Sequence, residues 1–233
     1  MQLTVREVGQ FLSVTEATVA RWIKERGLPA HRVGGRHRFN RAEVLEWATA
    51  HQVRVSAELF AADAAPGDAA PDLVAAIESG GIVFKLSAAD KRSALQALVQ
   101  ALPLPDAIDR DLLLQLFLAR EAMASTAVGN GIALPHVRNP VVLDVERPRI
   151  TLCFLERPVD FGALDGQPVD VLFSLISPTA RQHLQLISRL SYALHDAGLR
   201  QALARHAARD EILKELRRIE AGLAAVGARK AAT

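Results

Sequence analysis

The chain has 233 residues, of which 50% are hydrophobic, so it can bury one large core or two small ones without disulfides or metals. Its single cysteine, Cys153, excludes an intramolecular disulfide, and neither a run of about 18 apolar residues nor a secretory leader is present, so we expect a cytoplasmic protein without a membrane span. The net charge of +2 conceals an asymmetry: residues 1–55 hold nine basic and five acidic residues, whereas residues 56–233 hold 19 and 21, which favours a nucleic-acid contact at the N-terminal end.

Three helices and a hairpin are predicted over residues 1–55. Each helix start is marked by a capping residue followed three positions later by a glutamate: Thr4 with Glu7, Ser13 with Glu16, and Asn40 with Glu43. The second helix is expected to end near Arg26 and to turn Val19, Ala20, Trp22 and Ile23 inward. The pair Gly34-Gly35 predicts a tight two-residue turn between two short strands.

Residues 2–50 resemble the excisionase-like, MerR-related winged helix-turn-helix family. The resemblance is carried by the runs Leu3–Val8, Thr18–Ile23, Gly27–Ala30 and Val33–Phe39. It implies that the second helix enters the major groove of DNA and that the hairpin is a wing beside the backbone or the minor groove. The spacings agree, because Thr15, Thr18 and Arg21 share one helix face and the hairpin carries Arg32, Arg36 and Arg38, which can neutralise phosphates.

Two questions about this small module stay open at the level of sequence. A helical module of this kind can also serve as an adaptor that binds protein, and a few arginines are often only a solvated surface. A single module offers few base contacts, so specific binding to double-stranded DNA needs two half-sites. That requirement favours either a homodimer or a partner protein.

A linker is predicted over residues 56–71, which are rich in Ala, Asp, Pro and Gly. Beyond it, residues 72–221 alternate helix and strand patterns, and residues 222–233 form an Ala- and Gly-rich tail that we expect to fray. Strands are predicted at 150–155 and 169–176. Helices are predicted after Asp90, after Asp109 and after Thr179, and near 198–207 and 210–221. The expected fold class is α/β, with a mixed sheet covered by helices on both faces following the small N-terminal domain.

The run Ser125–His136 is the most informative stretch of the larger domain. Asn130–His136 within it resembles the active-site signature of the type-2 enzyme IIA family (the mannitol, fructose and nitrogen-regulatory branches) of the bacterial phosphoenolpyruvate phosphotransferase system. Arg120, 16 residues before His136, and His183, 47 residues after it, match the family's active-site arginine and second histidine, and Phe161–Asp170 resembles the segment that leads into the central strand. The resemblance covers roughly residues 72–221. It implies an α/β/α sandwich, a phosphoryl group carried by His136, and a phosphohistidine donor on the small carrier protein HPr or a nitrogen-branch relative of it.

The residue types suit this chemistry, because a neutral imidazole is a good nucleophile for reversible phosphoryl transfer and a cation stabilises the phosphoryl oxygens. Gly129 and Gly131 are interpreted as letting the backbone approach a tetrahedral anion. Val137 replaces the small residue that the family usually has at this position, which predicts a narrower approach or a different choice of partner. No third ligand accompanies His136 and His183, so neither a metal nor another cofactor is expected. His51, His195 and His206 are interpreted as solvated.

Together these features predict a DNA-binding regulator whose enzyme IIA-like domain accepts a phosphoryl group on His136. Two alternatives remain. The chain could be a sugar-specific transport component that passes phosphate to an enzyme IIB, or the domain could bind partners without being phosphorylated. Coupling between the two domains is also predicted, with its sign open: phosphorylation either holds the basic N-terminal domain against the site or releases a contact made only by the neutral histidine.

Overall fold

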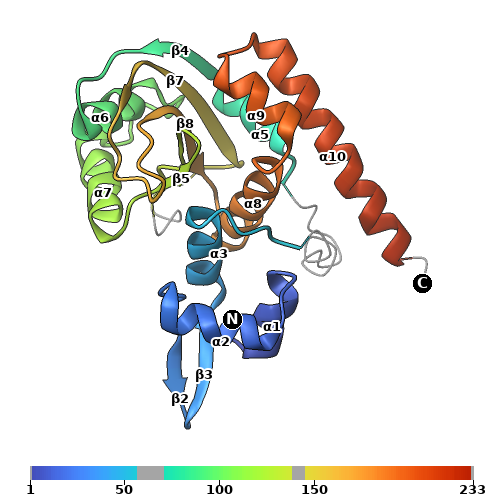
Figure 1. Ribbon diagram of the computed structural model, residues 1–233. Helices are drawn as coiled ribbons and strands as arrows, with labels where there is room; N and C mark the ends of the chain where they lie inside the picture. Colours follow the sequence, from blue (N-terminus) through green and yellow to red (C-terminus); the bar gives the residue numbers. More distant parts are fainter. Residues whose placement is uncertain (1, 57–70, 138–144, 232–233) are drawn as a thin grey trace.

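The computed structural model describes residues 2–56, 71–137 and 145–231, with side chains as far as residue 225. A small N-terminal domain lies against a larger one that is built on a five-stranded sheet (Figure 1). The predicted linker at 56–71 lies outside the described residues except at its two ends. Within the described residues, no helix combines the length and the apolar character needed to cross a membrane.

The N-terminal domain consists of three helices and a three-stranded sheet of order β1-β3-β2. Its elements are β1 Gln2–Leu3, α1 Val5–Phe11, α2 Glu16–Glu25, β2 His31–Val33, β3 Arg36–Asn40 and α3 Arg41–Ala50. The capping box of Thr4 with Glu7 is confirmed, and Asn40 caps α3. The predicted cap of α2 is wrong, because Thr15 rather than Ser13 accepts the hydrogen bond that starts this helix. Ser13 cannot cap it, since its φ of 53° belongs to the left-handed turn that follows α1.

The hairpin and most of the predicted inward positions are confirmed. Val33 pairs with Arg36 across the turn, and Gly34 and Gly35 both have positive φ, as this two-residue turn requires. Val19 and Trp22 of α2 are buried and Ile23 is half-buried, but Ala20 is exposed, because it lies about 100° around the helix from Val19 and outside the buried face.

The larger domain has a sheet of order β4-β7-β8-β6-β5, in which β4 and β6 run parallel to their neighbours β7 and β8 and the other pairs are antiparallel. Its strands are β4 Ile82–Leu86, β5 Ala127–Gly129, β6 Ile132–Ala133, β7 Arg149–Val159 and β8 Val169–Ile176. Its helices are α5 Leu73–Gly80, α6 Lys91–Ala101, α7 Arg110–Met123, α8 Ala180–Ala193, α9 Ala197–Ala204 and α10 Arg209–Ala231.

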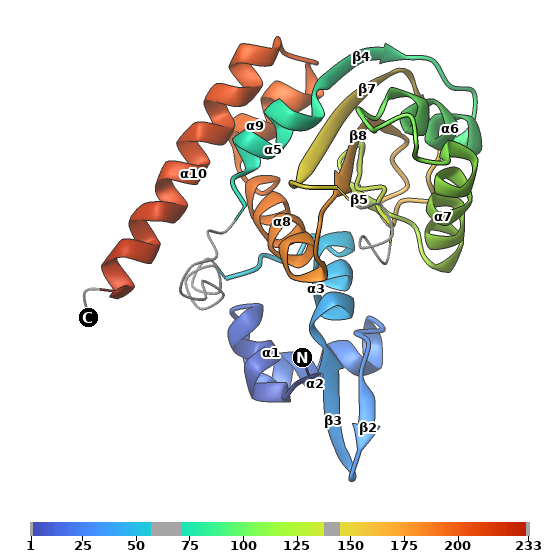
Figure 2. The same ribbon diagram turned by 180° about the vertical axis from the view of Figure 1, so that it is seen from behind.

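Successive side chains of the two central strands, β7 and β8, point to opposite faces of the sheet and so contribute to two separate cores. Cys153 and Leu172 face the core formed with α6 and α7, whereas Phe154 and Phe173 face the core formed with α5 and α8–α10. Figures 1 and 2 show these helices on opposite faces of the sheet. The predicted α/β/α sandwich is therefore confirmed. The last helix differs from the prediction, because α10 continues to Ala231 instead of fraying near Gly222, in keeping with the high helix propensity of its alanines.

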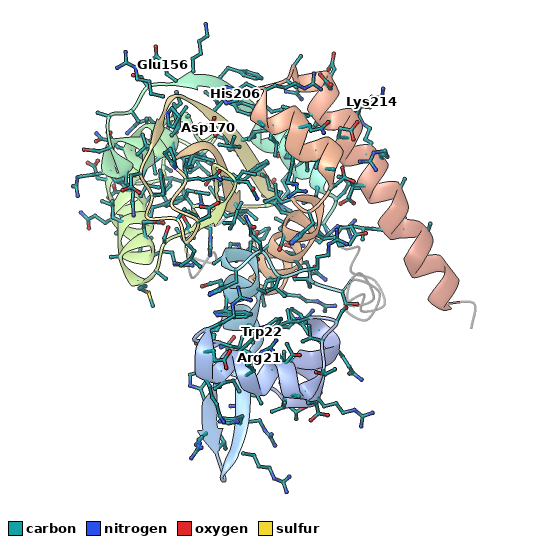
Figure 3. The ribbon with its side chains drawn as sticks, viewed as in Figure 1. Arg21, Trp22, Glu156, Asp170, His206 and Lys214 are labelled. Carbon is teal, nitrogen blue, oxygen red and sulfur yellow. The ribbon has the colours of Figure 1, made fainter. Side chains whose placement is uncertain are left out.

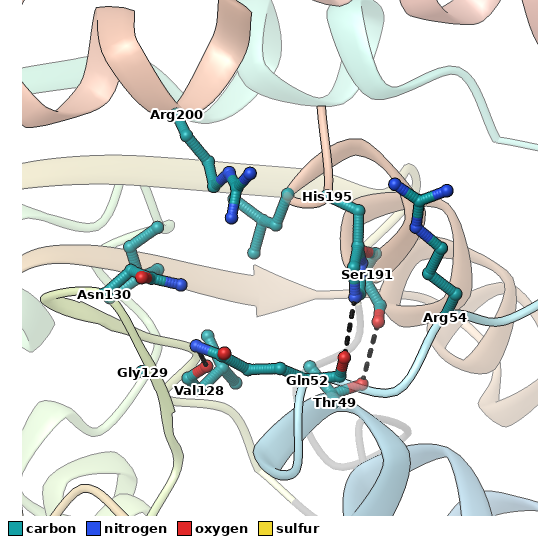
Figure 4. A pocket seen from close by; sticks show the side chains of 11 residues that line it. Thr49, Gln52, Arg54, Val128, Gly129, Asn130, Ser191, His195 and Arg200 are labelled. Carbon is teal, nitrogen blue, oxygen red and sulfur yellow. Dashed lines mark hydrogen bonds between the residues drawn. The ribbon is translucent and has the colours of Figure 1, made fainter. Parts of the chain in front are cut away.

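The two domains share a seam formed by α3 and the segment that follows it. One buried apolar cluster runs from the N-terminal domain into the sheet face that carries α8. Polar contacts line the same seam (Figure 4): the hydroxyls of Thr49 and Ser191 lie 3.1 Å apart, and Nε2 of Gln52 donates to the carbonyl oxygen of Val128 at 3.2 Å. Nε2 of His195 lies 3.0 Å from the carbonyl oxygen of Gln52. The N-terminal domain is thus packed onto the larger one rather than merely tethered to it.

Candidate functional site

His136 is held by backbone contacts just beyond β6. The residue forms an isolated parallel bridge with Leu175 of β8, so its position is fixed by the central sheet. Its Nδ1 lies 2.7 Å from the carbonyl oxygen of Leu134. A carbonyl oxygen only accepts, so Nδ1 carries a proton in this contact, and in the neutral imidazole Nε2 keeps the lone pair. The residue is only 4% exposed, and Nε2 has no hydrogen-bond partner among the described residues.

His183 supplies a second buried imidazole, on the first turn of α8. Thr179 caps this helix, and the ring of His183 lies 5.2 Å from that of His136, centroid to centroid. Neither of its nitrogens has a hydrogen-bond partner among the described side chains and backbone atoms. Burial lowers the pKa of His183 from 6.5 to about 3, and the neighbouring His136 and Arg120 add to the effect. His183 is therefore a neutral imidazole that can donate one hydrogen bond.

Arg120, on the last turn of α7, brings positive charge to the two histidines. It is 6% exposed, and its Nη1 donates to the carbonyl oxygen of Ala124 at 2.9 Å. Its Nη2 donates, also at 2.9 Å, to Oε2 of Glu46, which comes from α3 of the N-terminal domain. The other carboxylate oxygen, Oε1, lies 3.6 Å from Nε2 of His136. A carboxylate thus stands between the arginine and the lone pair of His136.

Glu121, the neighbour of Arg120, fixes the chain that leads to His136. Its Oε2 accepts hydrogen bonds from the backbone nitrogen of Thr126 at 3.1 Å and from the Thr126 hydroxyl at 2.6 Å. Its Oε1 lies 3.3 Å from Nζ of Lys91. Glu121 therefore connects α7 to the start of β5 and sets where the strand pair before His136 begins.

The structure brings the three predicted residues His136, His183 and Arg120 into one buried cluster. Sequence reasoning missed Glu46, since nothing in its helix distinguishes this glutamate from the capping partner Glu43 one turn earlier. Val137, expected to narrow the approach or to change the choice of partner, has its side chain buried in the core against α6 and α7 and so does not line the approach to His136.

The glycines of the motif have a different role from the one expected. Gly129 and Gly131 have φ of 82° and 74° and build the turn between β5 and β6. A Cβ on Gly129 would lie 2.3 Å from Nε2 of Gln52, and one on Gly131 would lie 2.9 Å from a carboxylate oxygen of Asp170. A second carboxylate, that of Asp165, accepts from the backbone nitrogen of Asn130. Carboxylates beside this turn disfavour an anion there, so the glycines serve close packing, Gly129 against Gln52 at the seam and Gly131 against Asp170 within the larger domain.

The other histidines are not simply solvated, as the sequence suggested. His51 stacks on Trp47 with 4.3 Å between ring centroids, and His206 lies 3.0 Å from a carboxylate oxygen of Asp170. Both nitrogens of His195 contact backbone carbonyls, those of Ser191 and Gln52. In the described parts of the chain no group of three His, Cys, Asp or Glu side chains is arranged to hold a metal ion.

The predicted DNA-contacting residues lie on the part of the N-terminal domain that faces away from the seam. Arg21 on α2 and Arg32 and Arg36 on the hairpin are exposed, and the hairpin extends away from the larger domain (Figures 1 to 3). Arg38 is half-buried, and its guanidinium donates to the carbonyl oxygen of His37. Thr15 caps α2, and its hydroxyl lies 3.0 Å from that of Thr18.

Comparison with known protein families gives two matches. The model of the phosphoenolpyruvate-dependent sugar phosphotransferase system EIIA 2 family matches residues 76–219, and a helix-turn-helix domain model matches residues 3–52. Both matches fall on the two domains described above, and the first includes all three members of the buried cluster.

Individual relatives match the larger domain. The nitrogen regulatory protein of Pseudomonas aeruginosa is 40% identical over 97 residues, which are 41% of this chain and 61% of the relative. The nitrogen regulatory protein of Bradyrhizobium diazoefficiens is 33% identical over 124 residues, 52% of this chain and 79% of the relative. The crystal structure of nitrogen regulatory protein IIA-Ntr from Neisseria meningitidis superimposes with a TM-score of 0.51 at 26% identity, and covers 58% of this chain and 92% of that one.

Proposed function

Because the chain belongs to the phosphoenolpyruvate-dependent sugar phosphotransferase system EIIA 2 family and carries a helix-turn-helix domain, we propose that it is a DNA-binding regulator that is phosphorylated on Nε2 of His136. The observation that supports the proposal most directly is the hydrogen bonding and burial of this imidazole. Nδ1 contacts the carbonyl of Leu134, whereas Nε2 is buried without a hydrogen-bond partner, and the imidazole lies beside His183 and beside the carboxylate of Glu46, which binds Arg120.

The transfer needs little beyond positioning and charge. Nε2 attacks the phosphorus of a phosphohistidine donor such as HPr. As the phosphorus–Nε2 bond forms, the bond from phosphorus to the donor's ring nitrogen breaks and its electron pair returns to that nitrogen. Arg120 stabilises the negative charge on the phosphoryl oxygens, and the neutral His183 donates one hydrogen bond to them. Neither residue exchanges a proton in this scheme.

The N-terminal domain binds duplex DNA in this proposal. Arg21 and Thr18 on α2 approach the major groove, while Arg32, Arg36 and Arg38 on the hairpin meet phosphates. Support comes from the match to a helix-turn-helix domain, from the basic charge of residues 1–55, and from the exposure of Arg21, Arg32 and Arg36. A homodimer supplies the two half-site contacts that specific binding requires.

Reconstitution with labelled phosphoenolpyruvate, enzyme I and HPr tests the phosphoryl part of the proposal. We expect label on the full chain and no onward transfer when an enzyme IIB is added. Efficient transfer to the enzyme IIB would instead identify a transport component. No label from any of the carriers would leave a partner-binding module that uses the fold without the chemistry.

A further inference from the structure

We propose that helix α3 of the N-terminal domain is an internal ligand of the phosphoryl site, so that docking of this domain and phosphorylation of His136 exclude each other. The inference rests on the proposed phosphorylation of His136 and adds the regulation of that site. It starts from Glu46, a residue outside the enzyme IIA-like domain, whose carboxylate reaches the centre of the buried cluster.

The carboxylate of Glu46 takes the place that phosphoryl oxygens would need. One of its oxygens accepts from Nη2 of Arg120 at 2.9 Å, and the other lies 3.6 Å from Nε2 of His136. A carboxylate and a phosphoryl group are both anions that bind a guanidinium through their oxygens. Glu46 therefore supplies the anionic partner of Arg120 in the unphosphorylated protein. Because this arginine is only 6% exposed, its charge would otherwise be buried without a carboxylate.

Docking of α3 also closes the approach to His136. An incoming donor must bring its phosphorus to Nε2, and Oε1 of Glu46 already lies 3.6 Å from this atom. Beside Glu46, a groove of about 480 Å³ is lined from the N-terminal domain by Pro29 and Trp47 and from the larger domain by Met123 and Leu164. The last two are the most exposed large apolar side chains of the described residues, at 62% and 68%. A carrier protein that reaches His136 must displace α3 from this face.

Phosphorylation of His136 makes the seam more negative, beside a carboxylate that is already there. A phosphoryl group adds close to two negative charges where the Glu46 carboxylate now lies, and it offers Arg120 a stronger partner. Glu46 and the phosphoryl group cannot both occupy this position, so the phosphorylated chain has α3 released. The other polar contacts at the seam, Thr49 with Ser191, Gln52 with Val128 and His195 with the carbonyl of Gln52, contain no ion pair, so these hydrogen bonds and the shared apolar cluster are what release must overcome.

This switch changes the orientation of the DNA-binding module relative to the larger domain. It does not cover the face of the module that contacts DNA. Arg21 is exposed and the hairpin extends away from the seam, so they stay accessible in the docked form (Figures 1 and 3). Docking fixes the module relative to the larger domain, and release frees it to reorient. Because coupling is reciprocal, docking disfavours phosphorylation of His136 by the same factor by which phosphorylation disfavours docking.

The test uses the full chain and potassium phosphoramidate, a small donor whose phosphorus–nitrogen bond breaks with release of ammonia. We compare the wild type with Glu46→Gln, Glu46→Lys and the control Glu43→Gln, which changes the same residue type one turn earlier, where the carboxylate contacts His31. We expect labelling of His136 to be roughly ten-fold faster in Glu46→Lys, intermediate in Glu46→Gln and unchanged in Glu43→Gln.

A distance measurement distinguishes release of the domain from a local effect. Spin labels are placed on Val33→Cys and Glu156→Cys, both exposed, while the native Cys153 is fully buried and stays unlabelled. We expect one narrow distance distribution in the unphosphorylated chain, and a broad one after phosphorylation and in Glu46→Lys. Equal labelling rates with an unchanged distance would overturn this inference while leaving the proposed function intact. Absence of label in every variant would overturn the proposed function, and this inference with it.

Discussion

Glu46 and Arg120 are separated by 74 residues and belong to different domains, yet they form a hydrogen-bonded ion pair of 2.9 Å beside His136. The pair connects the helix-turn-helix domain directly to the candidate phosphoryl site. Through it, a chemical change on one imidazole reaches the position of a whole domain, with no need for a long chain of intervening contacts.

Arg120 is predicted to stabilise the charge that develops during transfer. Arg120→Ala should slow phosphorylation by about ten- to a thousand-fold, equivalent to about 1.4–4 kcal/mol of lost stabilisation. The rate of labelling with HPr as donor checks this. Since Arg120 also binds Glu46, the double variant Arg120→Ala/Glu46→Ala serves as the control. Its rate should stay low even though nothing then holds α3 over the site. A well-folded Arg120→Ala variant with an unchanged rate would exclude the arginine from the reaction.

His183 is predicted to make the free energy of unfolding depend on pH. Its pKa is about 3 in the folded protein and 6.5 when unfolded, so the unfolded chain binds a proton more readily. The free energy of unfolding therefore keeps its full value above pH 6.5 and decreases as the pH falls towards 3, by up to about 1.4 kcal/mol for each pH unit. Urea titrations of wild type and His183→Asn between pH 7.5 and 4.5 measure the difference. Parallel pH profiles for the two proteins would show that His183 titrates normally in the fold.

The hairpin arginines are predicted to contribute to DNA binding without regard to sequence. Arg36→Ala and Arg38→Ala should weaken binding of the full chain to all duplexes and reduce its dependence on salt, because each removes a phosphate contact. Arg21→Ala should also relax any sequence preference, since it lies on the helix that approaches base edges. Fluorescence anisotropy at several salt concentrations measures these effects. Arg92→Ala, an exposed arginine at the start of α6, is the control and should bind like the wild type.

Cys153 is predicted to be chemically silent in the native protein. Burial on the central strand β7 raises the pKa of its thiol to about 12, so the reactive thiolate is scarce and shielded from reagents. Reaction with a thiol reagent should follow unfolding, and it therefore reports the opening of this core. Rapid modification under native conditions would mean that the core against α6 and α7 opens easily.

The sequence predicts much of the fold because its local signals are strong. Thr4 with Glu7, Gly34-Gly35 and Thr179 each act through a contact within a few residues, and the two central strands stand out by their apolar runs. The short strands β5 and β6 escape prediction, because they are too brief to show a period. Ala231 as the end of α10 escapes it as well, since Gly222 reads as a helix breaker.

Some residues of the candidate site could also be predicted from the sequence, whereas others could not. Arg120, His136 and His183 were found through a family motif with characteristic spacings, and the structure brings them together. Glu46 carries no such signal, because its role depends on how one domain packs on another. The half-buried His195 was missed for the same reason, since one of its two carbonyl contacts comes from the segment that follows α3. Contacts across a domain seam leave no periodic pattern in the sequence.

Identification of the phosphorylated nitrogen decides whether Nε2 of His136 carries the phosphoryl group. The full chain labelled with ¹⁵N-histidine is phosphorylated, and the acid-labile product is examined by NMR alongside His136→Ala and His183→Ala. We predict phosphorus on Nε2 of His136, no label in His136→Ala, and slower but detectable labelling in His183→Ala. Full labelling of His136→Ala, or phosphorus on Nδ1 in place of the bond to the Leu134 carbonyl, would contradict it.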